Sequence, residues 1–480
     1  MPKRDSALTV TDQFCGAGGS SQGAKQAAEK KNLGNGFKIQ LALNHWQLAI
    51  DTHNTNFPDT DHDCTDIQAC DPRRYPSTDI LLTSPECTTH SPAGGNTHKA
   101  LKTQMDLFKK NKIDPSTERS RATMWDVVRF AEYHQYRAIV TENVIEAKTR
   151  WPLFDVWLSA MHKLGYEHKC VYLNAMFCWP TPQSRDRMYV VFWKKGNKAP
   201  DLEFRPLAYS PKLAKDVEAV QVWKNTNRKF GKYGKHGQYY YACPITGDIV
   251  TPYYYAAFNC IDWSIPGTRI GDRKTPLKPK TMKRIESGIE KYGNDRFMIG
   301  KSDTGIVSPF FTSAEHSSQL ITWSSVDPYK TQTTVQSQGI VVPNSPFIVN
   351  NYGTSNSSSI MNPIGSITAG GINHGIVTTE NWRSFIGYYY GNSQDSGMTS
   401  PIGAATTKDR HYLVNIPEDK VKVEDCYYRM VKAHEVKKAM AFEDDYIVLG
   451  DSREQVKQCG NAVAPPAMRD IMERVIETLL

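Results

Sequence analysis

A cysteine follows an apolar segment in the stretch TSPECTTHS, which runs from Thr83 to Ser91. Cys87 stands there between a Pro-Glu pair and a group of small polar residues, and a packed core does not require a thiol in such company. The thiol could be a nucleophile, a metal ligand or a chance occurrence. Its sequence neighbours alone do not decide among the three.

Three other short segments carry residue types that suit chemistry. FCGAGGSSQG (Phe14–Gly23) leads from an apolar run into a helical pattern, so a ligand could approach its backbone and a helix N-terminus. TENVIE places Glu142 at the end of another apolar run, and PQSRDRMYVV places Arg185 and Arg187 on one side of an incoming strand by period 2. Each segment alone also fits a simpler explanation, namely a tight turn, an exposed salt bridge or a solvated strand edge.

The elements that must position these residues alternate along the first part of the chain. Strands are expected at 8–14, 37–44, 79–84, 137–143 and 187–193, and helices at 20–31, 46–57, near 124–131 and at 152–165. Such alternation predicts an α/β domain with a mostly parallel, doubly wound sheet. In such sheets ligands bind beyond the carboxyl ends of the strands. The glycine loop, the Cys87 segment and the Glu142 segment all fall at such ends.

The composition excludes several classes of protein. Of 480 residues, 39% are hydrophobic and 22% are charged, which is ordinary for a globular protein, and no apolar run is long enough to span a membrane. The 10 cysteines occur singly, without a CxxC pair, so we expect no metal site and a reducing, cytoplasmic location. The net charge of +8 permits a polyanionic partner without demonstrating one.

The sequence changes character after about Lys194. Residues 205–300 are basic and aromatic, most of all in WKNTNRKFGKYGKHGQYYY (Trp223–Tyr241), and Tyr239–Tyr255 has the pattern of a hairpin. Residues 431–442 and 466–480 return to helical patterns.

An internal repeat occupies residues 326–414. Its three segments each carry a threonine five positions after a proline (Pro328, Pro363 and Pro401), with an apolar pair further on. Short apolar runs between Gly, Asn and Ser turns at this period predict three copies of a β-rich unit stacked side by side.

Taken in order, the chemical motifs resemble those of one family, the DNA (cytosine-5) methyltransferases. FxGxGG, Pro-x-Cys, ENV, QxRxR and a C-terminal GNAV (Gly460–Val463) follow one another as they do in that family, over roughly 8–193 and 426–480. The resemblance implies a Rossmann-like, S-adenosylmethionine-dependent methyltransferase domain with a doubly wound sheet. A β-rich target-recognition domain would accompany it.

The chemistry of that family implies a role for each catalytic candidate. Cys87 would add as a thiolate to C6 of a flipped-out cytosine, which makes C5 able to attack the methyl group of S-adenosylmethionine. Glu142 would hold N3 and the exocyclic amine of the base. Arg185 and Arg187 would stabilise the negative charge that develops on it.

Further positions match the binding residues of the family. Those for S-adenosylmethionine are Phe14, Gly16, Gly18, Gly19, Asn44, Asp66, Asn461 and Val463. Those for the substrate are Pro85, Ser91, Asn143 and Gln183, beside a lid over DNA at 92–121. In the basic stretch, Lys229 and Lys232, together with Lys224, Arg228 and Lys235, are expected to contact phosphates.

The resemblance also divides the chain and suggests its partners. We expect a catalytic domain at 1–200, a target-recognition domain at 201–425, and a segment at 426–480 that packs back on the catalytic domain. The expected partner is double-stranded DNA, bound by a monomer, with a cognate restriction or defence system in a prokaryotic or phage setting. An RNA (tRNA) cytosine-5 methyltransferase and a non-catalytic DNA-binding homologue are the alternatives.

Three features depart from the family pattern. Glu86 stands between Pro85 and Cys87, where its carboxylate should raise the pKa of the thiol unless it points away or is paired. Asn44 stands where the family has an acid that binds the ribose. The region between QxRxR and GNAV is unusually long. We expect ordinary methyl transfer with an altered loop, while transfer of another one-carbon group stays open.

Overall fold

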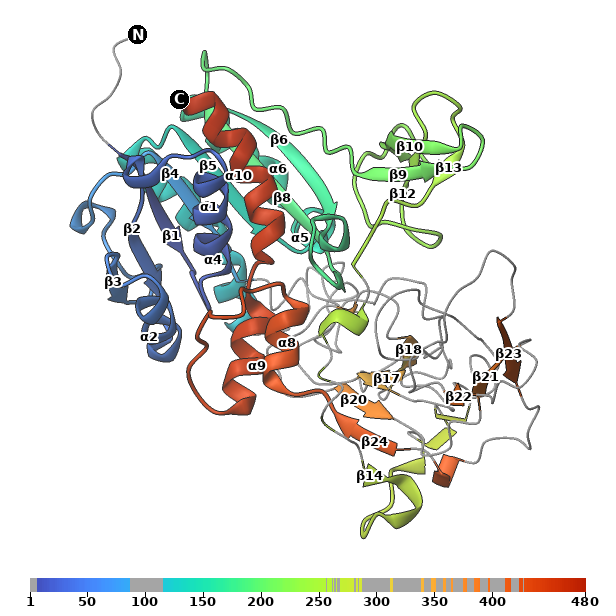
Figure 1. Cartoon of the computed structure of the whole chain (residues 1–480). Helices are drawn as coiled ribbons and strands as arrows, with labels where there is room; N and C mark the ends of the chain where they lie inside the picture. Colours follow the sequence, from blue (N-terminus) through green and yellow to red (C-terminus); the bar gives the residue numbers. More distant parts are fainter. Residues whose placement is uncertain are drawn as a thin grey trace, which may run out of the picture. The chain divides into compact units, whose positions relative to one another are not determined.

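The structure is a computed structural model of the chain (Figure 1), and it describes residues 7–86, 115–255 and 427–480, with separate short segments between 257 and 425. It divides into two compact units. The first comprises Met1–Tyr255 and Lys437–Leu480, and the second comprises Ala256–Val436.

A seven-stranded sheet forms the centre of the first unit, in the order β3-β2-β1-β4-β5-β8-β6. The strands are β1 (Leu8–Gln13), β2 (Phe37–Asn44), β3 (Asp61–Cys64), β4 (Ile80–Thr83), β5 (Ala138–Asn143), β6 (Tyr166–Asn174) and β8 (Asp186–Lys194). The first five strands in this order, from β3 through β2, β1 and β4 to β5, run parallel. β8 runs antiparallel to both of its neighbours, β5 and β6. The chain winds in opposite directions on the two sides of β1, so the switch point of the sheet lies between β1 and β4. The predicted α/β domain with a mostly parallel sheet is confirmed.

Both faces of the sheet are buried at its centre, which explains the apolar runs of β4 and β5. Leu81 and Ile139 belong to the main hydrophobic cluster on one face. Their neighbours Leu82 and Val140 are fully buried as well, but they point to the other face because side chains alternate along a strand.

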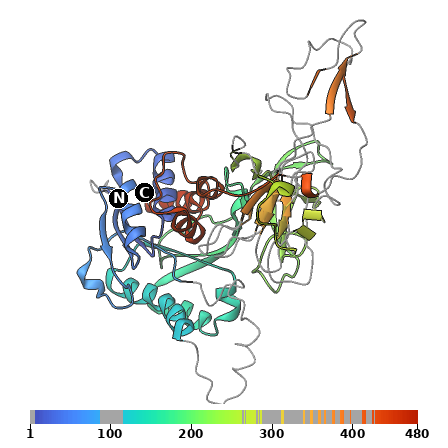
Figure 2. The same ribbon diagram turned by 90° about the horizontal axis from the view of Figure 1, so that it is seen from below.

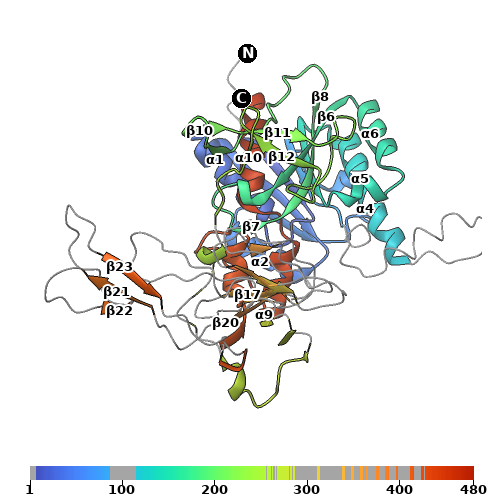
Figure 3. The ribbon, with the colours of Figure 1, turned by 90° about the vertical axis from the view of Figure 1, so that its right-hand side faces the viewer.

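Helices pack around the sheet. They are α1 (Gly19–Lys30), α2 (Gln47–Asn56), α4 (Pro115–His134), α5 (Glu146–Arg150), α6 (Phe154–Lys163), α9 (Ser452–Asn461) and α10 (Pro465–Leu479). Helices α1 and α10 lie side by side on one face, and α4 and α6 lie on the other (Figures 2 and 3). The C-terminal residues therefore pack beside the first helix of the chain.

Two strands of the sheet have no counterpart in the sequence prediction. In the edge strand β6 the polar run Glu167–Lys169 follows Tyr166, because part of an edge strand faces solvent and needs no apolar side chains there. Strand β3, DHDC, is the other edge strand and is polar throughout. Apolar periodicity therefore detects the central strands and misses both edges.

Small antiparallel sheets follow the central one within the first unit. They contain β9 (Leu207–Ser210), β10 (Lys215–Glu218), β11 (Val220–Trp223), β12 (Tyr239–Ala242) and β13 (Ile249–Val250). β12 and β13 form the predicted hairpin. Tyr239 and Tyr241 join the main hydrophobic cluster, so the compact unit continues past the expected domain boundary at 200.

The second unit is rich in short strands. One sheet has the order β14-β24-β20-β16-β15-β17-β18 and a second has the order β22-β21-β23. The strands are β14 (Thr268–Arg269), β15 (Phe311–Ser313), β16 (Gln338–Ile340), β17 (Phe347–Asn350), β18 (Ser357–Ser359), β20 (His374–Val377), β21 (Ser384–Tyr388), β22 (Ser396–Gly397), β23 (His411–Asn415) and β24 (Tyr427–Met430).

Strands from the predicted repeat segments occur in both of these sheets. β16 and β20, one repeat apart, pair in parallel in the same sheet. The corresponding β23 pairs with β21 in the other sheet, so the prediction of three copies side by side is wrong for the third copy. The repeated prolines Pro328, Pro363 and Pro401 lie outside the described residues.

None of the described helices is long and apolar enough to cross a membrane.

Candidate active site

The glycine-rich loop after β1 turns sharply at the switch point of the sheet. Phe14, Gly16 and Gly18 have φ angles of 57°, 52° and 82°, in the left-handed region. A phenylalanine rarely adopts this conformation, and such strain is concentrated at functional sites. The Gly18 N–H donates to the Cys15 carbonyl (2.8 Å), which closes the turn. The loop thus presents its backbone to the crevice between β1 and β4.

The C-terminal segment closes the loop from behind. A Cβ atom on Gly19 would lie 2.0 Å from the carbonyl oxygen of Val463, and one on Gly18 would lie 2.2 Å from the Tyr446 hydroxyl. That hydroxyl donates to the Ala17 carbonyl (2.5 Å). The predicted neighbour Val463 therefore touches the loop directly, while Asn461 ends α9 with an exposed side chain. Tyr446 has no signal in the sequence motifs and was missed.

Two further cofactor candidates lie beyond neighbouring parallel strands. Asn44 ends β2, and its Oδ1 accepts from the Trp46 N–H (3.0 Å), which fixes the start of α2. Asp66 follows β3 with an exposed side chain, and its Oδ1 accepts from the Gln68 N–H (3.1 Å). Trp46, two residues after the end of β2, was not among the predicted residues, although an aromatic residue near a strand end can stack on a ligand. Its indole faces the Lys457 ammonium at 4.3 Å from the ring centroid.

A buried chain of polar side chains supports the loop from below. Ser21 donates to Asp12 Oδ2 (2.7 Å) and is bonded to His53 Nε2 (2.9 Å), while His53 Nδ1 is bonded to His62 Nε2 (2.8 Å). Burial raises the pKa of Asp12 to about 7, against the bonds from Ser21. Burial and the neighbouring His62 lower the pKa of His53 to about 3. Near neutral pH the His53 imidazole is therefore neutral, and the Asp12 carboxyl group easily takes up a proton.

Replacing Asp12 by asparagine is expected to change how stability depends on pH. In the unfolded chain the pKa of Asp12 is about 3.9, so between about pH 4 and pH 7 folding takes up a proton and stability falls as the pH rises. Asp12→Asn removes this loss and keeps an acceptor for Ser21. Its free energy of unfolding, minus that of the wild type, should increase by about 3 kcal/mol between pH 5 and pH 8. Urea unfolding at several pH values measures the difference, and parallel curves would refute the expectation.

The most distinct charged pair lies at the end of β5. Glu142 is 8% exposed, and its Oε1 lies 3.0 Å from Arg187 Nε, on the adjacent antiparallel strand β8. Arg187 Nη1 also donates to the Asp186 carbonyl (2.8 Å). A carboxylate and a guanidinium are thus fixed together beside the crevice.

The loop that leads to the candidate nucleophile is tied to the same strand end. Asn143 Nδ2 donates to the Pro85 carbonyl (3.2 Å), and the Asn143 side chain is buried. Glu86, the next residue, has its Oε1 3.9 Å from His45 Nδ1, so its carboxylate has a partner at the end of β2. Cys87 and Ser91 lie outside the described residues. The described chain nevertheless brings the residue before Cys87 to the edge where Glu142 lies.

The first arginine of the QxRxR motif, Arg185, binds a different part of the chain from Arg187. Arg185 lies between β7 (Gln183–Ser184) and β8, and its Nη2 donates to the carbonyls of Gly460 (3.3 Å) and Ala462 (2.9 Å). This buried guanidinium thus binds the C-terminal GNAV segment. Gln183 is fully buried, and within the described part of the chain its side-chain amide has no hydrogen-bond partner.

The basic stretch forms an ordered loop between β11 and β12. Lys224 donates to the carbonyls of Gly234, Lys235 and Gly237 at 2.9, 2.7 and 2.9 Å. The Lys224 ammonium group therefore stabilises the loop. Its bonds to these carbonyls compete with the predicted bond to a phosphate. Lys229 is exposed, and Lys232 pairs with Glu146 Oε1 (2.8 Å).

One edge of the sheet therefore carries two sets of groups. The backbone of the Phe14–Gly19 loop, with the polar residues Asn44 and Asp66 and the aromatic residue Trp46, lies at the carboxyl ends of β1, β2 and β3. A carboxylate–guanidinium pair stands beyond β5, beside the segment that leads to a thiol. The described residues contain no group of three or more His, Cys, Asp or Glu side chains that could hold a metal ion.

Comparison with known protein families gives one match over most of the chain. The family described as C-5 cytosine-specific DNA methylase matches residues 8–236 and 308–477. The match includes the central sheet, the basic loop and the C-terminal helices.

Relatives among characterised proteins are distant. The chain is 26% identical over 208 residues to the Type II methyltransferase M.SacI of Streptomyces achromogenes, covering 39% of this chain and 48% of that protein. It is 25% identical over 245 residues to the Type II methyltransferase M1.ScrFI of Lactococcus lactis subsp. cremoris, covering 48% and 56%. The chain thus spans about half the length of these relatives.

Solved structures that match the chain include a DNMT2 variant of Spodoptera frugiperda. It has 12% sequence identity and a TM-score of 0.48, and the match covers 98% of this chain and 100% of that one. The methyltransferase EhMeth of Entamoeba histolytica matches at 12% identity and a TM-score of 0.47, covering 99% and 100%.

Proposed function

The chain belongs to the C-5 cytosine-specific DNA methylase family, and we propose on this ground that it is an S-adenosylmethionine-dependent DNA (cytosine-5) methyltransferase. The observation that carries the proposal is the Glu142–Arg187 pair at the end of β5, with Asn143 bonded to the Pro85 carbonyl. This arrangement brings a carboxylate and the segment that leads to Cys87 to the same edge of the sheet.

The proposed chemistry begins with the thiolate of Cys87. Its sulfur adds to C6 of an extruded cytosine and forms a C–S bond, while the ring electrons move toward C5 and N3. Glu142 binds N3 and the exocyclic amine, and Arg187 fixes the Glu142 carboxylate and offsets the negative charge on the ring. After C5 has gained the methyl group it loses its proton to a base. The C–S bond then breaks and the thiolate leaves.

The residues beyond β1, β2 and β3 fit the cofactor. When it is bound, S-adenosylmethionine would supply an electrophilic methyl group from its sulfonium, with S-adenosylhomocysteine as the leaving thioether. The backbone of the Phe14–Gly19 loop would face its methionine part, since the Tyr446 hydroxyl and the Val463 carbonyl leave no room for side chains at Gly18 and Gly19. Asn44 would bond the ribose, and Trp46 with Asp66 would bind the adenine.

Arg185 has a different role in this proposal. Because it bonds the carbonyls of Gly460 and Ala462, it holds the GNAV segment behind the cofactor loop. It is thus a positioning residue, and Arg187 is the arginine that reaches the reacting base through Glu142.

The partners follow from the same proposal. Double-stranded DNA is the substrate, bound by a monomer. The β-rich second unit, Ala256–Val436, reads the target sequence, and a cognate restriction enzyme accompanies the methyltransferase.

Trapping of the covalent intermediate tests the function. The protein is incubated with S-adenosylmethionine and a pool of random-sequence duplexes that contain 5-fluorocytosine. Fluorine at C5 blocks the final elimination, so a stable protein–DNA adduct is expected with the wild type and none with Cys87→Ser. A wild type without adduct would overturn the proposal, and an adduct formed with an RNA pool alone would assign an RNA substrate. Sequencing of methylated DNA from a methylation-free host then gives the recognised site.

A further inference from the structure

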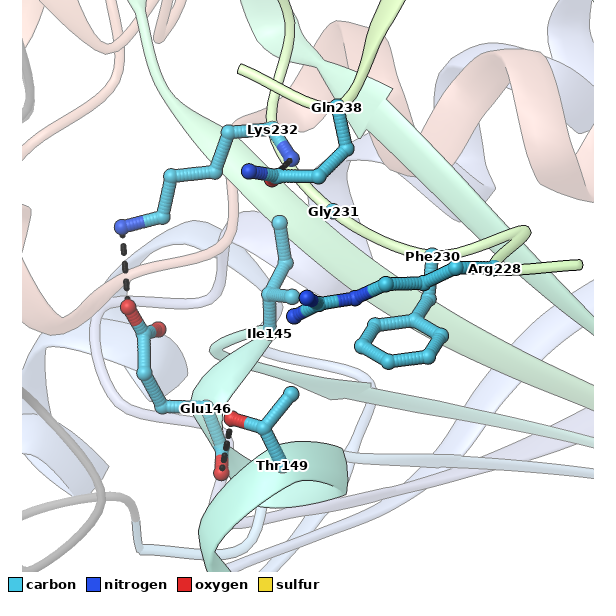
Figure 4. Close-up of a pocket in the computed structure, with 8 residues that line it drawn as sticks. All are labelled: Ile145, Glu146, Thr149, Arg228, Phe230, Gly231, Lys232 and Gln238. Atoms are coloured by element: carbon cyan, nitrogen blue, oxygen red, sulfur yellow. Dashed lines mark hydrogen bonds and ion pairs between the residues drawn. The ribbon is translucent and has the colours of Figure 1, made fainter. Parts of the chain in front are cut away.

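We propose, as an extension of the proposed function, that a cavity beside the candidate catalytic pair is a subsite for one phosphodiester of the DNA substrate. The cavity has a volume of about 240 Å³ and lies between α5 and the basic loop (Figure 4). Ile145, Glu146 and Thr149 form one wall, and Arg228, Phe230 and Lys232 form the opposite wall. The first wall begins two residues after Asn143 along the chain, and therefore at the same end of β5 as Glu142.

The cation in this cavity is Arg228. Its guanidinium carbon lies 4.6 Å from the centroid of the Phe230 ring, so the aromatic face holds the side chain in place. Figure 4 shows the guanidinium pointing toward Ile145 and Glu146 across the cavity. Within the described part of the chain, no carboxylate forms an ion pair with it. A planar guanidinium that is held on a ring is suited to two parallel hydrogen bonds with a phosphate.

The charge of the cavity favours an anion. Glu146 is the one acidic residue among those that line it, and the Lys232 ammonium already neutralises it at 2.8 Å (Figure 4). Lys148 adds a further cation near the Phe230 ring, at 5.6 Å from its centroid. Arg228 is therefore the group left to bind a phosphate oxygen, and a neutral base edge would match this charge less well.

Hydrogen bonds within the basic loop hold the wall of the cavity that carries Arg228. Lys224 binds three carbonyls of the basic loop, and Gln238 Oε1 accepts from the Lys232 N–H (2.9 Å). A site that is formed before the ligand arrives loses little conformational entropy on binding.

The basic loop contacts residues that lie close in sequence to each member of the Glu142–Arg187 pair. Lys232 pairs with Glu146, shortly after Glu142 in the chain, and the Tyr233 N–H donates to Asp186 Oδ1 (3.0 Å), directly before Arg187. A phosphate bound by Arg228 is thereby held at a fixed place relative to Glu142 and Arg187. The subsite would set the register of the DNA backbone at the catalytic pair.

The salt dependence of DNA binding tests the subsite. Fluorescence anisotropy of a labelled random-sequence duplex gives the slope of log K against log salt for the full-length protein. Arg228→Met should make this slope shallower by about one, the loss of one phosphate contact, and Arg228→Lys should restore it in part. Lys215→Met is the matched control, because it removes one exposed positive charge from β10, outside the cavity.

The outcomes separate the two proposals. A slope unchanged by Arg228→Met, or changed equally by Lys215→Met, overturns the subsite whether or not the protein forms the Cys87 adduct. A shallower slope for Arg228→Met alone supports the subsite, even if no adduct forms and the catalytic proposal fails.

Discussion

Arg187→Met is expected to lower kcat for DNA methylation by about a thousandfold, because the charge that develops on the base loses its stabilising partner. It should also destabilise the fold by about 3–5 kcal/mol, since Glu142 is 8% exposed and would keep a buried charge without its ion-pair partner. Rates of methyl transfer to DNA and urea unfolding measure the two effects.

A second substitution separates these effects. The double variant Glu142→Gln/Arg187→Met removes both charges of the pair, so most of the lost stability should return while activity stays low. Arg187→Lys keeps the charge but loses the planar fork, and it should fall between the wild type and Arg187→Met. A folded Arg187→Met protein with activity within tenfold of the wild type would contradict the assigned role.

The central part of the site could be predicted from the sequence because the apolar pattern of the strands and the geometry of a parallel sheet indicate the same location. Strands β4 and β5 are buried on both faces, so their apolar runs Ile80–Leu82 and Ala138–Val140 are unambiguous. The residues that follow such strands meet at one edge by the geometry of a parallel sheet. This places the Gly16–Gly19 loop, Pro85 and Glu142 together without any knowledge of side-chain contacts.

The two arginines of QxRxR show where the periodic pattern fails. Period 2 places Arg185 and Arg187 on the same side, but only if both belong to one strand. Arg185 lies between β7 and β8, so alternation does not govern its direction and its side chain turns to the C-terminal segment. Its partners are backbone carbonyls far along the chain, which no local pattern can indicate.

The charged residues show a related limit. The sequence places Glu86 next to the thiol, whereas the structure gives its carboxylate a partner in His45 on a different strand end. The sequence predicts that Lys224 is a surface cation available to phosphate, yet its ammonium group binds three carbonyls of its own loop. The basic character of a segment is a property of the sequence. Which of its cations remain available to a ligand depends on the folded backbone.

Gly19→Ala is expected to raise the Kd for S-adenosylmethionine by about a hundredfold. The new Cβ would lie 2.0 Å from the carbonyl oxygen of Val463, and a backbone atom cannot move aside as a flexible side chain does. Either the loop after β1 or the Gly460–Val463 segment must shift by roughly 1 Å, a displacement that can cost about two orders of magnitude where groups must be aligned. Isothermal titration with S-adenosylmethionine measures the change.

Gly23→Ala is the matched control, because it introduces a comparable backbone clash on α1 without touching the cofactor loop. Its Cβ would lie 2.4 Å from the Pro465 carbonyl oxygen, at the start of α10. Overpacking of this kind costs about 1–3 kcal/mol, so both variants should unfold at lower urea concentrations than the wild type. Only Gly19→Ala should lose affinity strongly, since only its clash involves a residue of the Phe14–Gly19 loop and would displace that loop. Equal losses of affinity would mean that the loop responds to helix packing in general, and an unchanged affinity of Gly19→Ala would remove the loop from the cofactor site.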